Sequence, residues 1–214
     1  MCIIFIRVYL CISGIQKIRW QIFNSMKKLF PVLLVLLFGC SEKKNTHPEI
    51  VISTSMGDIE AELYPDKAPK TVAAFLQYID AGYYKNSVFY RVVMQEGMSA
   101  SLNTGIIQGG IWESQKINLA GIPHESTQLS KLSHANGTLS LARTAPGTAN
   151  SEFFICVGDQ TQYDYGNDGV GDKQGYSAFG KVTKGMDVVR KIQQQAVNGD
   201  QLVERIVIKN IERE

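Results

Sequence analysis

The residues best suited to chemistry in this chain are an arginine, a glutamine and an aromatic side chain, each inside a short apolar run. They are Arg91 in Phe89-Tyr90-Arg91-Val92-Val93, Gln108 in Ile106-Ile107-Gln108-Gly109-Gly110, and Phe154 in Phe153-Phe154-Ile155-Cys156-Val157. A guanidinium stays charged at any physiological pH and presents several donors in one plane. An aromatic slot suits a ring that carries no polar group. These residue types favour stabilisation of a polarised or twisted amide over nucleophilic attack.

Side chains for nucleophilic or metal chemistry are present, but their sequence context does not favour such chemistry. Ser140, Ser151 and His134 have neither a nucleophile elbow nor an ordered triad around them, so a hydrolase is disfavoured. The cysteines form neither a disulfide framework nor a zinc pattern; they are Cys2, Cys11, Cys40 and Cys156. The histidines are scattered without helical spacing; they are His47, His124 and His134. We therefore expect no metal site and no cofactor.

An aspartate-rich segment from Tyr163 to Gly175 raises calcium binding as an alternative. Asp164, Asp168 and Asp172 are spaced as ligands could be, but glycines stand where an EF-hand loop requires acidic residues. We interpret the segment as a solvated loop.

The elements that must position the candidate side chains are mostly short strands. Residues 50–54 and 58–63 predict a hairpin that turns at Met56-Gly57. Other strands are expected over residues 89–93, 106–109, 178–182 and 204–211, and residues 137–157 predict strand, turn, strand. In that last stretch Leu139 and Leu141 alternate with Ser140 and Ala142, and Phe153 is expected to face the core.

Two helices complete the pattern. Apolar residues recur at helical spacing from Thr71 to Ala81, before Gly82, and a second short helix is expected from Met186 to Gln195. Residues 94–105 are expected to form a surface loop and residues 110–133 to be mostly irregular. Many short strands with two helices indicate an all-β barrel or sandwich, and the pattern alone does not choose between them.

The charge of the chain is unevenly distributed. The full sequence has 214 residues, is 44% hydrophobic and has a net charge of +2. Residues 1–39 hold five of the 22 basic residues and none of the 20 acidic ones, which leaves 17 against 20, or −3, for the remainder. A mildly acidic domain without a basic stripe disfavours nucleic acid as a partner.

The N-terminal region indicates an address rather than a folded element. Residues 26–39 have a short basic region, then the apolar run from Leu29 to Phe38 and a small residue, which is typical of a secretory signal. Cys40 follows directly, so the segment resembles a bacterial lipoprotein signal in which Cys40 is lipidated. The run is shorter than the ~20 residues that span a bilayer. A core helix or an uncleaved membrane anchor remains the alternative.

This interpretation divides the chain into four parts. Residues 1–25 have no use in it and are interpreted as a mis-called extension ahead of Met26. Residues 26–39 form the lipoprotein signal peptide, residues 40–48 a polar tether, and residues 49–214 the functional domain. We expect lipid anchoring in a bacterial cell envelope, on an extracytoplasmic (periplasmic or outer-membrane) face.

Four blocks of the chain, in this order, are shared with one known family. They are Phe89-Tyr90-Arg91-Val92-Val93, Gly105-Ile106-Ile107-Gln108-Gly109-Gly110, residues 137–157, and Phe179-Gly180-Lys181-Val182 with Gly185-Met186-Asp187-Val188-Val189. From Glu49 to the C-terminus the sequence closely resembles the cyclophilin family of peptidyl-prolyl cis/trans isomerases. The resemblance implies a mainly β fold, a closed eight-stranded antiparallel β-barrel capped by two α-helices.

The resemblance also implies roles for individual residues. Arg91 takes the place of the catalytic arginine, and Gln108 that of a glutamine which orients it and bonds the peptide backbone. Phe154 corresponds to the floor of the proline pocket and Ala142 to a backbone contact on the groove wall. The remaining substrate-binding predictions are Ile106, Arg143, Glu152, Tyr163 and Tyr176. Without the resemblance, the simpler interpretations are an exposed strand arginine or a surface ion pair for Arg91, and a core side chain for Phe154.

One difference from the family pattern affects the pocket wall. Gly105-Ile106 stand where many cyclophilins have Phe-Met, so an aromatic wall is expected to be missing unless Met94, Met98 or another loop residue covers the slot.

Other differences lie along the groove. Arg143 and Glu152 replace the asparagine and glutamine of eukaryotic members, and we expect them to pair across their hairpin. Tyr176 stands at the position of a groove histidine and Tyr163 near that of a tryptophan, which predicts weak cyclosporin binding.

Two functions follow from these features. The first is an isomerase that accelerates X–Pro rotation while extracytoplasmic proteins fold. The second is a non-catalytic module on the same fold that binds proline-containing segments or chaperones unfolded chains. The intact Arg91, Gln108 and Phe154 favour the enzyme, and the thinned wall at Gly105-Ile106 favours the binder. The expected partners are proline-containing polypeptides and, through Cys40, a membrane; the protein is expected to be a monomer.

Overall fold

The computed structural model describes residues 47–95, 103–111 and 117–214, and residues 47–214 form one compact unit. The expected extension, signal peptide and lipidation site at Cys40 lie outside the described residues, as does most of the expected tether. Residues 96–102 of the expected surface loop also lie outside them. Among the described residues, no helix is long and apolar enough to cross a membrane.

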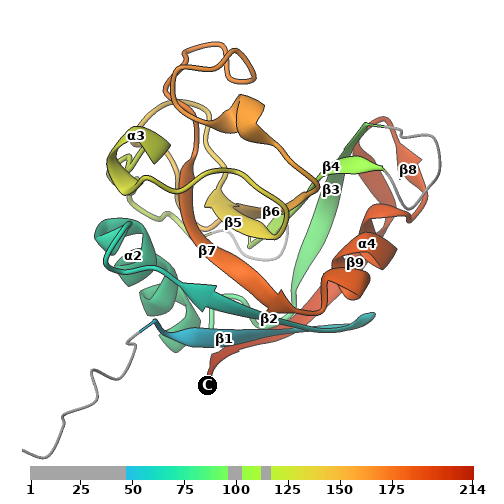
Figure 1. Ribbon diagram of the computed structural model, residues 1–214. Helices are drawn as coiled ribbons and strands as arrows, with labels where there is room; N and C mark the ends of the chain where they lie inside the picture. The colour runs from blue at the N-terminus through green and yellow to red at the C-terminus, as the bar shows by residue number, and fades with distance from the viewer. Residues whose placement is uncertain (1–46, 96–102, 112–116) are drawn as a thin grey trace, which may run out of the picture. The chain divides into compact units, whose positions relative to one another are not determined.

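The strands form a closed antiparallel barrel (Figure 1). They are β1 Glu49–Thr54, β2 Gly57–Leu63, β3 Ser87–Gln95, β4 Thr104–Gly110, β5 Thr138–Leu141, β6 Phe153–Val157, β7 Ser177–Lys184, β8 Val197–Asn198 and β9 Gln201–Arg213. Their order is β1-β2-β7-β5-β6-β4-β3-β9, and β1 pairs with β9 to close the ring. The two-residue β8 pairs with β9 outside this ring. The expected eight-stranded barrel is therefore confirmed, and the alternative of a sandwich is wrong.

Strand alternation separates a main core from a second, smaller apolar cluster. Leu139, Leu141, Phe153 and Ile155 belong to the main core with the other inward side chains. Phe154 belongs to the second cluster, in which Ile106 and Cys156 are also buried. Because successive residues of a strand point to opposite faces, each of β4, β5 and β6 contributes to both sides of the barrel wall.

The two expected helices are present, and a third short one was not expected. α2 spans Pro69–Asp80 and α4 spans Met186–Gln193, and the two lie on opposite sides of the barrel in Figure 1. The third helix, α3, spans Thr127–Ser130, within the segment expected to be irregular. A single turn is too short to leave an apolar periodicity in the sequence. The expectation of two helices was therefore incomplete.

A distant glutamate caps the N-terminus of α2. The residue at the N-cap position, Ala68, offers no side-chain cap. Instead the buried carboxylate of Glu125 accepts hydrogen bonds from the backbone N–H groups of Lys70 (3.1 Å) and Thr71 (2.8 Å). A carboxylate at this end satisfies unpaired N–H groups and interacts favourably with the helix dipole. The contact anchors the segment around Glu125 to α2.

Candidate active site

The candidate residues form a row across four neighbouring strands, on the side of the barrel wall away from the main core. Ser140 of β5 pairs with Phe154 of β6, Phe154 pairs with Gln108 of β4, and Gln108 pairs with Arg91 of β3. Directly opposed residues in a sheet have Cβ atoms ~5 Å apart. The strand register therefore brings Arg91, Gln108 and Phe154 together, although 63 positions separate the first from the last in the sequence.

A β-bulge in β3 lets Arg91 face this row. Phe89 pairs with Gly109 and Arg91 with Gln108, so Tyr90 is the extra residue of the bulge. Phe89 and Val92 consequently both reach the main core, although strict alternation would place them on opposite faces. The bulge leaves Tyr90 and Arg91 together on the side of the candidate site.

Arg91 is held by hydrogen bonds from two directions. Its Nε–H donates to Asp200 Oδ2 at 2.6 Å, and Nη1 donates to Gln108 Oε1 at 3.0 Å. Gln108 Nε2 donates to the hydroxyl of Tyr90 at 2.8 Å, and that hydroxyl donates to Glu152 Oε2 at 2.8 Å. This chain fixes the guanidinium plane while 37% of the Arg91 side chain stays exposed.

The pKa values along this chain agree with the hydrogen-bond directions. Burial, followed by the nearby Glu152 carboxylate, raises the pKa of Tyr90, so its phenol keeps the proton that it donates. The hydrogen bond from Arg91 lowers the pKa of Asp200, so the arginine faces an ionised partner at neutral pH. The chain is thus a stable arrangement of donors and acceptors, with the positive charge at the exposed end.

A cleft of about 580 Å³ opens beside Arg91. Every candidate substrate-binding residue predicted from the sequence lines it: Ile106, Gln108, Ala142, Arg143, Glu152, Phe154, Tyr163 and Tyr176. Residues that the sequence analysis did not propose also line it, namely Val93, Thr144, Thr148, Asn150 and Gly169. The structure thus places the predicted residues in one cleft, and their roles toward a substrate stay predictions.

Phe154 forms the floor of the cleft, under two tyrosines. The rings of Tyr163 and Tyr176 approach it edge-on, at centroid distances of 5.9 and 5.2 Å. Their own centroids are 5.5 Å apart. Such edge-to-face contacts are favourable arrangements of aromatic quadrupoles. Phe154 is only 2% exposed and is one of the residues that line the cleft.

Aliphatic side chains also line the cleft. Val93 and Ile106 pack in the same cluster as Phe154, whereas Met94 does not line the cleft and donates no wall to it. Gly105 has a φ of +136°, and a Cβ there would lie 1.9 Å from the Val93 carbonyl oxygen. Position 105 therefore cannot carry an aromatic side chain in this backbone. Met98, the other candidate for a cover, lies outside the described residues.

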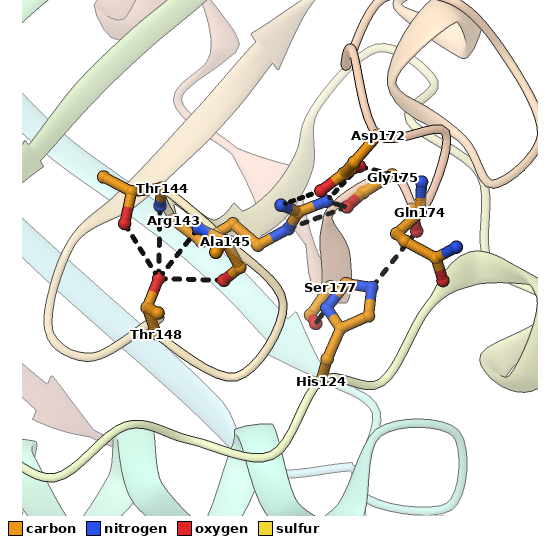
Figure 2. Close-up of polar contacts among 9 residues, drawn as sticks. All are labelled: His124, Arg143, Thr144, Ala145, Thr148, Asp172, Gln174, Gly175 and Ser177. Carbon is orange, nitrogen blue, oxygen red and sulfur yellow. Dashed lines mark hydrogen bonds and ion pairs between the residues drawn. The ribbon is translucent and has the colours of Figure 1, made fainter.

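Arg143 fastens the loop that carries the tyrosines. Its Nη1 and Nη2 donate to the two carboxylate oxygens of Asp172 at 2.7 and 2.9 Å, and its Nε donates to the Gly175 carbonyl at 3.0 Å (Figure 2). Its guanidinium also lies 5.3 Å from the centre of the Tyr176 ring. The expected pairing of Arg143 with Glu152 is wrong, because the guanidinium pairs with both carboxylate oxygens of Asp172 instead. The Arg143 side chain is 2% exposed, and its charge is paired with Asp172 of the loop.

Figure 2 also shows the contacts of Thr148 and His124. The Thr148 hydroxyl accepts from the Ala145 N–H at 3.0 Å and donates to the Ala145 carbonyl at 2.8 Å, which closes the turn after Arg143. On the far side of the loop, His124 Nε2 lies 3.1 Å from the Gln174 carbonyl oxygen and Nδ1 lies 3.1 Å from Ser177 Oγ. His124 thus holds the C-terminal end of the loop, at Gln174 and Ser177.

The aspartates considered for calcium each have a different partner. Asp164 contacts His134, Asp168 contacts Lys173 and Asp172 contacts Arg143. Among the described residues, no group of three or more His, Cys, Asp or Glu side chains is placed to hold a metal ion.

Sequence reasoning missed the two partners that hold the arginine chain. Asp200 follows Asn198-Gly199, a dipeptide typical of tight hairpins, and Gly199 has the left-handed φ of +65° that such a turn needs. That signal could have placed an acidic residue at a hairpin next to β3. Tyr90 gave no such signal, since its position depends on a bulge that the alternation pattern does not reveal.

The barrel with this cleft on its wall is the fold of a cyclophilin-type protein. A solved cyclophilin-type isomerase of Cryptosporidium parvum superposes with a TM-score of 0.63 at 24% identity, over 78% of this chain and 98% of the other. A structure determined in the presence of the dipeptide Ala-Pro gives 0.60 at 25% identity, over 76% and 96%.

The sequence comparisons agree with the fold. The chain belongs to the family of cyclophilin-type peptidyl-prolyl cis-trans isomerases, whose model matches residues 49–213. It is 36% identical to a peptidyl-prolyl cis-trans isomerase of Acinetobacter baylyi over 78% of this chain and 82% of the relative. It is 37% identical to peptidyl-prolyl cis-trans isomerase B of Escherichia coli over 67% of this chain and 82% of the relative. The predicted family is thereby confirmed.

Proposed function

We propose that this protein accelerates the cis/trans rotation of X–Pro peptide bonds in polypeptides that bind the cleft. Rotation is slow because the amide has partial double-bond character, which gives a barrier of ~20 kcal/mol. Lowering that barrier requires no nucleophile and no cofactor. It requires groups that bind the twisted amide more strongly than the planar one.

The observation that carries the proposal is the position of Arg91 between its two holders and beside the aromatic floor. Asp200 and Gln108 take Nε and Nη1, and Arg91 shares the cleft with Phe154. A guanidinium that is already held in place needs no reorganisation when the amide polarises during rotation. Its donors therefore stabilise the twisted amide more than hydrogen-bond donors in bulk water would.

The cleft supplies separate groups for binding and for chemistry. The apolar cluster around Phe154 and Ile106 receives the proline ring, which has no polar group to satisfy. Arg91 then donates to the prolyl nitrogen or to the carbonyl oxygen that moves past it. As the prolyl nitrogen becomes pyramidal, its lone pair becomes a better acceptor, so this hydrogen bond strengthens on the way to the transition state. The structure solved with Ala-Pro present supports a proline-containing peptide as the ligand class.

An isomerisation assay on a proline-containing tetrapeptide tests the proposal. We expect Arg91→Ala to lower kcat/KM by about 10²–10³-fold, the range seen when one charge-stabilising donor is lost. Arg213→Ala is the matched control, because Arg213 pairs with Asp80 and does not line the cleft. It should retain the wild-type rate. Equal rates in wild type and Arg91→Ala would contradict the role of Arg91.

A binding module without useful catalysis is the second candidate, and one observation favours it. Phe154 is 2% exposed beside Tyr163 and Tyr176, and its other apolar neighbours in the cleft include the aliphatic Val93 and Ile106. A peptide that binds with measurable affinity to a wild-type protein without isomerase activity would select this candidate.

We further propose that the protein is a lipid-anchored lipoprotein of the bacterial envelope, with Cys40 as the modified residue, and that it assists the folding of extracytoplasmic proteins. The support is the basic, apolar and small-residue order of residues 26–40. Metabolic labelling with a fatty acid, followed by mass spectrometry of the N-terminal peptide, tests it. Label should be lost in Cys40→Ala. Recovery of peptides from residues 1–25 would contradict a start at Met26.

We propose that the protein acts as a monomer. Light scattering of the domain that begins at Ser41 should give the monomer mass, and a dimer mass at assay concentrations would contradict this.

A further inference from the structure

A buried hydrogen-bonded chain lies behind the floor of the cleft. His134 is 0% exposed, with Nδ1 2.6 Å from Asp164 Oδ1 and Nε2 2.9 Å from Ser140 Oγ. The backbone N–H of His134 also donates to Asp164 Oδ1 at 3.0 Å, and the Ser133 hydroxyl donates to Oδ2. Asp164 therefore accepts hydrogen bonds at both oxygens, and both ring nitrogens of His134 are engaged.

Serine, histidine and aspartate hydrogen-bonded in this order are the side chains of a nucleophilic triad. Here, however, these three hydrogen-bonded side chains have no access to a substrate. Ser140 and His134 are each 0% exposed, and neither lines the cleft. A triad serine must reach the carbonyl that it attacks. The sequence-based rejection of a hydrolase thus agrees with the burial, although the three side chains are in fact hydrogen-bonded to one another.

The direction of the chain is set by the aspartate. Burial alone would raise the pKa of Asp164, but the hydrogen bonds from His134 and Ser133 outweigh it and lower that pKa. The ionised carboxylate can only accept, so His134 donates from Nδ1. On the other side of the ring, Nε2 lies 2.9 Å from the Ser140 hydroxyl, so both ring nitrogens are held and the orientation of the imidazole is fixed.

The imidazole contacts the aromatic side chains of the cleft. It stacks on Phe154 at a centroid distance of 5.8 Å and an interplanar angle of 16°. It meets Tyr163 edge-on at 6.1 Å and Tyr176 at 6.4 Å. Asp164 directly follows Tyr163 and caps the 3-10 helix Thr161–Tyr163 through its N–H bond to Thr161. One buried ring thus touches the strand-borne floor and both loop-borne tyrosines.

We propose that His134 and Asp164 are positioning residues of the isomerase site, which hold the Phe154 floor and the Tyr163 wall in the geometry that receives proline. The proposal rests on the proposed function, because it concerns how that cleft binds its ligand. It separates two tasks: Arg91, held by Asp200 and Gln108, acts on the rotating amide, whereas the His134–Asp164 pair shapes the apolar part of the cleft. Loosening the pair should therefore weaken proline binding and leave the bound reaction nearly unchanged.

The test compares Asp164→Asn with a control that removes a hydrogen bond of a residue outside the cleft lining. Asn keeps the shape of Asp but lets the His134 ring adopt either tautomer. We expect KM and the Kd of an Ala-Pro-containing tetrapeptide to rise by about 3- to 10-fold, the effect of one hydrogen bond, with kcat changed by less than about 2-fold. Thr54→Val is the control, because Thr54 is 1% exposed and its hydroxyl donates to Gly57 in the hairpin between β1 and β2. It should reduce stability with KM and Kd unchanged.

Each outcome decides the proposal. If Asp164→Asn lowers Tm as the control does and leaves KM and Kd at the wild-type values, the pair is merely structural and the proposal is overturned. A fall in kcat as large as the rise in KM would also overturn it. If Asp164→Asn does not fold, Ser133→Ala carries the test, since Ser133 is exposed and donates to Asp164; a Kd raised about 2-fold supports the proposal and an unchanged Kd overturns it. A wild type that binds peptide without turnover would count against the proposed function alone, because Kd still decides the role of the pair.

Discussion

The two halves of the cleft are held in different ways. In the strand-borne half, Arg91, Gln108 and Phe154 stand in register on adjacent strands of the barrel. In the loop-borne half, Tyr163 and Tyr176 flank a long loop that the Arg143–Asp172 ion pair and the His134–Asp164 pair fasten to the barrel.

Because of this difference, substitutions in one half should change the catalytic rate and substitutions in the other should change the affinity for ligand. Register in a sheet is fixed by many backbone hydrogen bonds and by the burial of one face, so a single side chain can be removed from the strand half without moving its neighbours. The loop half depends on a few side-chain contacts. A substitution there should move the tyrosines and alter how tightly a ligand binds, while the arginine chain stays in place.

Phe154→Ala should break the strand half most severely. The variant removes the floor and leaves a cavity in a cluster whose buried members are Ile106, Phe154 and Cys156. We expect kcat/KM to fall by at least about 100-fold and the free energy of unfolding to fall by about 3 kcal/mol, the lower end for a buried Phe-to-Ala change. Steady-state kinetics and urea unfolding measure the two effects. Unchanged peptide affinity in a folded Phe154→Ala protein would contradict its place as the floor.

Arg143→Ala should loosen the loop half and leave the chemistry intact. The substitution removes donors to Asp172 and Gly175 and the contact with Tyr176. We expect KM to rise about 5- to 10-fold with kcat within about 2-fold of wild type, since charged hydrogen bonds are lost outside the reacting groups. Arg143→Lys sharpens the comparison, because lysine keeps the charge and loses the two-pronged geometry. A fall in kcat alone would place Arg143 in the wrong half.

Asp200→Asn should have a smaller effect, on kcat. Arg91 and Asp200 are 37% and 45% exposed, so their ion pair is worth less than about 1 kcal/mol and the rate should fall about 3- to 5-fold. Asp187→Asn is the matched control, since Asp187 pairs with Lys191 on the surface of α4. It should leave kcat unchanged. If Asp200→Asn raised KM with kcat intact, Asp200 would belong to binding.

The smallest of these effects is expected from acid, which should disturb the loop half over a defined pH range. The hydrogen bonds from Arg143 lower the pKa of Asp172 to about 2. Because the folded pKa lies below the unfolded value of ~3.9, the clamp is fully present above about pH 4 and is lost as pH falls through about 2. Near-UV circular dichroism of the tyrosines should hold constant from pH 7 to 4 and change below. A change complete above pH 4 would show that Asp172 does not hold the loop.

Much of the strand half could be predicted from sequence, and most of the loop half could not. Alternation placed Leu139 and Leu141 against the main core and Ser140 and Ala142 on the other side, because burial of one face dictates a period of two. The bulge at Tyr90 escaped this reasoning, since it breaks the period without leaving a glycine as a marker.

Contacts between distant loop side chains carry no local signal. Arg143 was expected to pair with Glu152 across its hairpin, but Asp172, 29 positions away, supplies two oxygens to its fork. The buried hydrogen bond between His134 and Asp164 joins residues 30 positions apart, and no sequence motif predicts it. Long-range polar pairing depends on the closed barrel, which brings together segments that the sequence keeps apart.

The rate of cis/trans exchange within a saturated peptide complex tests the central claim most directly. Exchange NMR on a proline tetrapeptide compares wild type with Arg91→Lys, which keeps a positive charge but cannot donate to Asp200 and Gln108 while facing the amide. We expect Arg91→Lys to show a Kd within about 2-fold of wild type and an exchange rate at least about 10-fold lower. Equal exchange rates in the two saturated complexes would contradict the claim that a guanidinium held in a fixed plane drives the rotation.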